Sequence, residues 1–141
     1  MITNFITADD YSASIRLELI EKAIRGEDSI LESVEDQAIA EMKSYLAGRY
    51  DVDAIFSATG DDRHALVLMI AKDIAIYHLC SIREGLMTQI RIDRYEHAIK
   101  WLEGVQKGEL AVEGLPRLPE EDMAAKSEYL MRSNPKRVNT F

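Results

Sequence analysis

The amino-acid sequence predicts an all-α fold: a compact bundle of about four helices around a buried central helix, with an extended C-terminal arm. Apolar residues recur at three- and four-residue spacings in four segments, and no segment alternates convincingly as a strand does. One segment is apolar on nearly every side, as expected of a central helix. All three prolines lie in the last 26 residues, where the apolar periodicity fades.

The first helical segment is expected to begin after Thr7, whose hydroxyl can cap a helix while Asp10 reaches back from the third position. Residues 12–14 form a weak patch where this helix can break. Gly26 ends the pattern. The apolar positions of this segment are four residues apart, at Tyr11, Ile15, Leu19 and Ala23.

The second segment opens with a capping box from Ser29 to Glu32. We expect Gly48 to end this helix, because glycine takes the left-handed conformation without a Cβ penalty. Residues 51–56 are then expected to form an apolar loop that is not helical. One face of the helix carries Val34, Ala38, Met42 and either Tyr45 or Leu46.

The third segment runs from Ala65 to Ile82 and is apolar at nearly every position. A helix that is apolar all round is buried, so this segment is predicted to be the central helix. Asp61 or Asp62 can cap its start. Lys72 and the aspartate after it interrupt the apolar run, which is too short to span a membrane, and we expect a soluble protein.

The fourth helix is predicted from an apolar pattern at Ile92, Tyr95, Ile99, Leu102 and Val105, with Gly108 as its C-cap. We therefore divide the chain into a helical domain at 1–112 and an extended arm at 113–141. Residues 126–141 hold four basic side chains and one acidic side chain, a net +3 against −11 for the rest of the chain. The arm therefore ends in a basic segment, whereas the domain is acidic.

Composition and spacing predict no catalytic, cofactor-binding or metal site, and therefore no enzyme. The net charge of −8 argues against a body that wraps nucleic acid. His64 and His78 are about 21 Å apart on one helix and cannot share a metal. Asp93 and His97 offer two ligands where zinc needs three or four. The lone Cys80 lies in an apolar run and is interpreted as a buried thiol.

Four stretches, in this order, resemble the small head–tail connector proteins of Mu-like phages and prophages. They are a Tyr-Leu-Ala-Gly-Arg-Tyr run, an Asp-Ile-Ala-x-Tyr run inside the buried helix, the last helix and an extended tail. The resemblance covers roughly residues 5–112. The matching positions are Tyr45, Leu46, Gly48, Arg49 and Tyr50 in the first run, Asp73, Ile74, Ala75 and Tyr77 in the second, and Arg94, Tyr95, Ala98, Ile99, Leu102 and Gly108 in the last helix.

The resemblance implies a structural subunit without catalysis or cofactor. Its expected partners are copies of itself in a ring, the portal protein above the ring and the next neck or tail-completion protein, with DNA passing nearby in the channel and no membrane contact. Its expected location is the virion neck after assembly and the bacterial host cytoplasm before it.

Candidate contact residues follow from residue type and position. Arginine and tyrosine are enriched at interfaces, so Arg49, Tyr50, Ile55 and Phe56 are candidates for the contact between subunits. In the alternative interpretation, Tyr50 folds back on its own core and Arg49 caps carbonyls of the second helix. Candidates for docking the arm on the portal are Tyr129, Leu130, Arg132, Lys136, Arg137 and Phe141.

A second function class is a small helical regulator that binds nucleic acid through its basic C-terminal arm. The acidic body has no basic recognition helix, and the turn near Gly48 is too long for a helix-turn-helix. The connector interpretation is therefore preferred.

Overall fold

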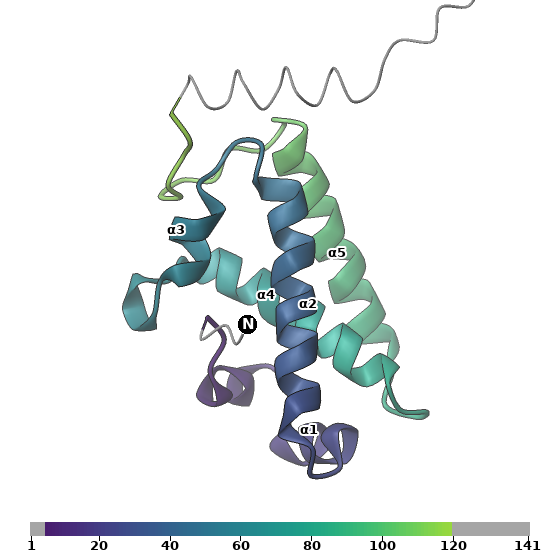
Figure 1. The fold of residues 1–141 in the computed structure, drawn as a ribbon. Coiled ribbons are helices and arrows are strands. Elements are labelled where there is room, and N and C mark those ends of the chain that lie inside the picture. Colours follow the sequence, from purple (N-terminus) through teal and green to yellow (C-terminus); the bar gives the residue numbers. More distant parts are fainter. Residues whose placement is uncertain (1–4, 120–141) are drawn as a thin grey trace, which may run out of the picture.

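The structure is a computed structural model in which residues 5–119 are described, and within that range it contains helices but no strand (Figure 1). The predicted all-α fold is confirmed. Two short 3-10 helices, η1 and η2, accompany the α-helices. The elements are η1 (Ala8–Ala13), α1 (Leu17–Ile24), α2 (Asp28–Leu46), α3 (Val52–Ser57), η2 (Gly60–Asp62), α4 (Ala65–Ser81) and α5 (Gln89–Gln106).

Helices α2, α4 and α5 form the centre of the molecule, and α4 packs against both of the others. Figure 1 shows α2 and α5 side by side, with their C-terminal ends at the same end of the domain and α4 crossing behind. Ala71 and Ile74 of α4 are completely buried, as predicted for a central helix. The burial is not complete around the helix, because Met69 is 44% exposed.

The N-terminal segment breaks where the weak patch predicted it. The chain forms η1, leaves helical geometry near Ser14 and starts α1 at Leu17. The Asp10 carboxylate accepts a hydrogen bond from the Thr7 backbone N–H at 2.7 Å, as the capping motif requires. Tyr11 is buried, and its hydroxyl donates to Glu35 Oε1 of α2 at 2.6 Å. This bond ties η1 to the centre of the bundle.

Several predicted helix ends are wrong. Helix α2 starts at Asp28 after Glu27, one residue before the predicted capping box. It ends at Leu46, its C-cap Ala47 has a right-handed conformation, and Gly48 does not have a positive φ. Of the three glycines predicted to end helices, Gly26 and Gly108 have the expected positive φ, at 81° and 80°. The end of α2 is instead held by the tertiary contacts of the residues that follow it.

The segment after α2 is also helical rather than a loop. Residues 52–57 form α3, because the Asp51 carboxylate caps the helix by accepting from the Ala54 N–H at 3.2 Å. Helix α4 is capped by His64 and not by the preceding aspartates. Its ring nitrogen accepts from the Val67 N–H at 3.4 Å.

Residues 108–118 fold back over the domain after α5 ends. Val112 and Leu115 belong to the buried core, with 8% and 7% exposure. The first residues of the predicted arm, from 113 to 118, are therefore packed against the helices. Among the described residues, no helix is long and apolar enough to cross a membrane.

Candidate interaction site

The turn that follows α2 directs Tyr50 into the protein. The backbone N–H groups of Arg49 and Tyr50 both donate to the Leu46 carbonyl, at 3.1 and 3.0 Å. The Tyr50 side chain is only 2% exposed, and its hydroxyl oxygen accepts from the Val112 N–H at 3.2 Å. A buried tyrosine hydroxyl needs such a partner. Tyr50 thereby fixes the segment that follows α5.

Backbone hydrogen bonds hold the same two segments together. The Asp51 N–H donates to the Pro116 carbonyl at 2.9 Å, and the Leu118 N–H donates to the Arg49 carbonyl at 3.2 Å. They surround an isolated antiparallel bridge between Tyr50 and Arg117. We call residues 49–51, His64 and residues 106–118 the C-terminal clasp.

Arg49 joins the clasp to the end of α5. Its Nε donates to the Gln106 carbonyl at 3.1 Å, where a cation complements the negative end of the helix dipole. The guanidinium lies against Gly108, where an added Cβ would come within 2.7 Å of Nη2. The positive φ of Gly108 favours glycine, and a side chain at this position would displace the Arg49 guanidinium.

His64 connects the clasp to the start of α4. Its Nε2 lies 2.8 Å from the Glu113 carbonyl oxygen, and its Nδ1 accepts from the backbone N–H of Val67. A carbonyl can only accept, so Nε2 must carry the proton, and Nδ1 must be unprotonated to cap the helix. The two contacts together select the neutral imidazole with its proton on Nε2.

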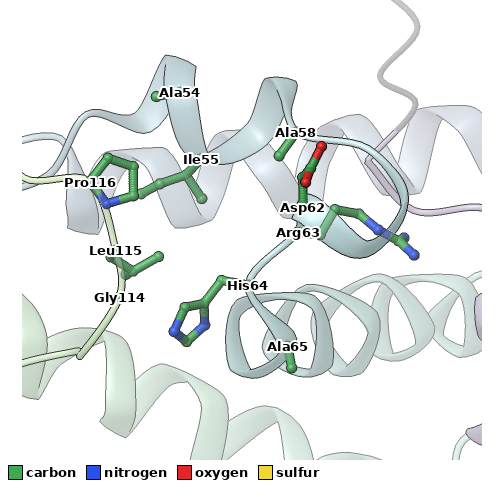
Figure 2. Close-up of a pocket in the computed structure, with 10 residues that line it drawn as sticks. All are labelled: Ala54, Ile55, Ala58, Asp62, Arg63, His64, Ala65, Gly114, Leu115 and Pro116. Atoms are coloured by element: carbon green, nitrogen blue, oxygen red, sulfur yellow. The ribbon is translucent and has the colours of Figure 1, made fainter.

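A cavity of about 380 Å³ lies beside this histidine. Figure 2 shows it between α3, the start of α4 and the chain at 114–116. Two of its polar side chains have structural duties: Arg63 pairs with Asp10, and His64 contacts the Glu113 carbonyl. The lining residues are Ala54, Ile55, Ala58, Asp62, Arg63, His64, Ala65, Gly114, Leu115 and Pro116.

A second polar cluster braces α2, α4 and α5. The Glu41 carboxylate accepts from the Tyr95 hydroxyl at 2.8 Å and lies 3.0 Å from His78 Nε2. Tyr77 stacks on Tyr95 with ring centroids 3.9 Å apart. Burial and the bond to Glu41 raise the pKa of Tyr95, so its hydroxyl remains a donor at neutral pH. These residues are far apart in the sequence, and no spacing rule pointed to them.

The structure separates the four predicted subunit-contact residues into two groups. Tyr50, Ile55 and Phe56 are buried at 2%, 3% and 6% exposure, with contacts inside their own chain. The Phe56 ring packs edge-on against the Phe5 ring, with ring centroids 5.0 Å apart. These three side chains pack within their own chain, whereas Arg49 is exposed. It meets the carbonyl of Gln106 in α5 rather than capping α2.

The six arm candidates, Tyr129, Leu130, Arg132, Lys136, Arg137 and Phe141, lie outside the described residues. Within residues 5–119, no group of three or more histidines, cysteines or acidic residues is placed to hold a metal ion. Asp93 accepts from the Gln89 amide at 2.8 Å, so this carboxylate takes part in a helix-surface pair.

The fold and the clasp define a class of protein: a small all-helical domain whose C-terminal segment is tied back at one end. The family model described as Bacteriophage Mu, Gp36 matches residues 3–132. The chain belongs to this family and is a Mu-like phage protein. No curated protein and no solved structure matched the chain.

Proposed function

We propose that this chain is a structural head–tail connector subunit, which forms a ring under the portal and offers a platform to the next neck or tail-completion protein. The observation that carries the proposal is the C-terminal clasp in a protein of the Mu Gp36 family. The connector acts by binding and performs no covalent chemistry.

The clasp gives the C-terminal arm a defined point of departure. Tyr50, Arg49 and His64 hold the chain at Val112, Gln106 and Glu113, and backbone bonds continue to Leu118. A binding segment that leaves a rigid body at a fixed place loses less conformational freedom when it docks. Residues beyond the clasp are thus well suited to reach a neighbour such as the portal.

The charge of the protein fits a wall of a DNA channel better than a DNA-binding surface. Residues 1–125 carry a net charge of −11, from the total of −8 and the +3 of residues 126–141. An acidic surface repels phosphates, so DNA can pass close to such a subunit without adhering to its body.

The isolated protein is expected to be monomeric or weakly associated. Rings use heterologous contacts, in which one surface of a subunit meets a different surface of the next copy. Without the portal as a template, each such contact is too small to hold the subunits together. Assembly on the portal then places the subunit in the virion neck.

A pull-down with portal rings of the same phage tests this proposal. The full chain should bind the portal, and a chain ending after Pro119 should keep its helicity and melting temperature but lose most of the binding. Equal binding by both chains would show that the arm has no role in docking to the portal. Failure of the full chain to bind portal, together with retention on DNA, would reject the connector and favour the nucleic-acid-binding alternative.

A further inference from the structure

Two arginines border a cavity of about 200 Å³ at the clasp end of the molecule. Arg49 uses Nε for the Gln106 carbonyl, and Arg117 lies over the Tyr50 ring with 5.8 Å from its Cζ to the ring centroid. The lining contains no carboxylate; its members are Arg49, Tyr50, Gly108, Leu110, Ala111 and Arg117. Among residues 5–119, neither arginine has an ion pair with an acidic side chain.

The rest of the lining suits a protein ligand. Leu110 is 44% exposed, and Ala111 is exposed beside it. An arginine fork binds a carboxylate with two parallel hydrogen bonds, and an adjacent apolar rim can bury the stem of the same side chain. Arginine beside tyrosine is also a common centre of protein interfaces.

The opposite charge lies at the other end of α2. From Glu27 to Asp36 the chain has five acidic residues and no lysine or arginine. Glu27, Asp28 and Glu32 are exposed. Figure 1 shows the start of α2 near α1, at the far end of the domain from the clasp.

The two charged regions cannot meet within one subunit. Helix α2 has 19 residues, and its ends are therefore about 28 Å apart. They can meet between copies, and such a contact joins two different surfaces, as a ring requires.

We propose that the cavity bordered by Arg49 and Arg117 receives exposed carboxylates from the first half of α2 of a second copy. This contact rests on the proposed ring and specifies which surfaces form it. Each subunit then presents its acidic end to one neighbour and its arginine cavity to the other.

Disulfide trapping tests the contact even where it is weak. In a Cys80→Ala background, Ala111→Cys places a thiol at the cavity and Ser29→Cys places one beside the acidic residues; both native side chains are exposed. A disulfide requires Cα atoms within about 7 Å, so bonding inside one chain is impossible. We expect a ladder of covalent oligomers under mild oxidation.

Matched variants define the control. The pair Ala111→Cys with Ala40→Cys uses another exposed position on α2 and should give no ladder. Adding Arg117→Glu to the first pair should reduce the cross-linked fraction about tenfold, the effect of roughly 1.4 kcal/mol. Combining Arg117→Glu with Glu32→Arg should restore it, because both partners of the contact are then reversed.

Three results would contradict the proposed contact between copies. The first is a ladder no stronger than that of the Ala40 control, and the second is a ladder unaffected by Arg117→Glu. The third is a stronger ladder after Glu120→Gln, Glu121→Gln and Asp122→Asn, since carboxylates of the same chain would then be the occupants. If the full chain still binds portal rings in any of these cases, the connector function stands and only this contact fails.

Discussion

Tyr50 contacts the chain after α5 in three ways, through its hydroxyl, its ring and its backbone. The hydroxyl accepts from Val112, the ring lies under Arg117, and the backbone forms the bridge to the same arginine. A tyrosine that joins two segments in this way is part of the fold of its own subunit. Arg49, by contrast, has an exposed side chain that borders the clasp cavity.

At the same scale, we predict that replacing His64 with alanine lowers the free energy of unfolding. The substitution removes both the cap of α4 and the bond to Glu113, and the loss of a cap alone costs about 1 kcal/mol. His64→Ser keeps a capping oxygen and should recover that part. Urea denaturation of the two variants measures the difference, and equal stability of alanine and serine variants would show that the cap contributes nothing.

The ion pair of Asp10 with Arg63 should make the stability of the fold depend on pH. Burial raises the pKa of Asp10, but hydrogen bonds from Arg63 and Thr7 outweigh this effect and lower it from 3.8 to about 2. Because the folded-state pKa is lowered, the stabilisation is present above pH 3.8 and is lost as the pH falls toward 2.

The matched variant for this dependence is Asp10→Asn, which has no charge to lose. Its stability deficit relative to the unmodified protein should be largest near pH 5 and should shrink as the pH falls toward 2. Denaturant midpoints of both proteins over this range measure it. A deficit that stayed constant would contradict the role of the Asp10–Arg63 pair.

At the scale of elements, apolar periodicity predicted the main helices, while local capping rules predicted their ends poorly. The bounds of α4 differ from the predicted segment by one residue and those of α5 by a few residues. The agreement is close because a long apolar pattern reflects burial along a whole helix face. Gly48 did not act as a helix terminator, because its φ is not positive and the chain after α2 is held by the contacts of Arg49 with Gln106 and of Tyr50 with Val112. α3 was missed because a six-residue helix is too short to show a period.

The buried position of α4 gives a prediction at this scale. Ile74 is fully buried, so Ile74→Asp would place an unpaired charge in the core and should cost of order 4 kcal/mol or more, enough to unfold the domain. Ile74→Val is the control and should cost about 1 kcal/mol. Circular dichroism with thermal melting distinguishes the two, and a folded aspartate variant with an unchanged melting temperature would refute the packing of α4.

At the scale of the whole molecule, the features that sequence reasoning missed are those that join distant parts of the chain. The cluster of Glu41, His78 and Tyr95 comes from three helices, and the clasp connects Arg49 and Tyr50 to residues more than fifty positions later. Residue type indicated that the Arg-Tyr pair makes a contact. It did not indicate which surface the contact uses, because periodicity reports which face is buried and not what covers it.

The folded body extends past the end of α5. Val112 and Leu115 are core residues, and the chain at 116–118 is bonded to residues 49–51. A chain ending after Pro119 keeps all of these contacts and should melt with the full-length protein. A chain ending after Ala111 loses two buried apolar side chains, each worth about 1.5 kcal/mol or more, and leaves the Tyr50 hydroxyl without its donor.

We therefore expect the shorter chain to melt roughly 10 °C lower than the chain ending after Pro119, given about 4 °C for each kcal/mol in a domain of this size. Thermal melting of the three chains measures the difference. Equal melting temperatures for the two truncated chains would mean that residues 112–119 add nothing to the core. The arm would then leave the body at the end of α5, and the clasp could not define its point of departure.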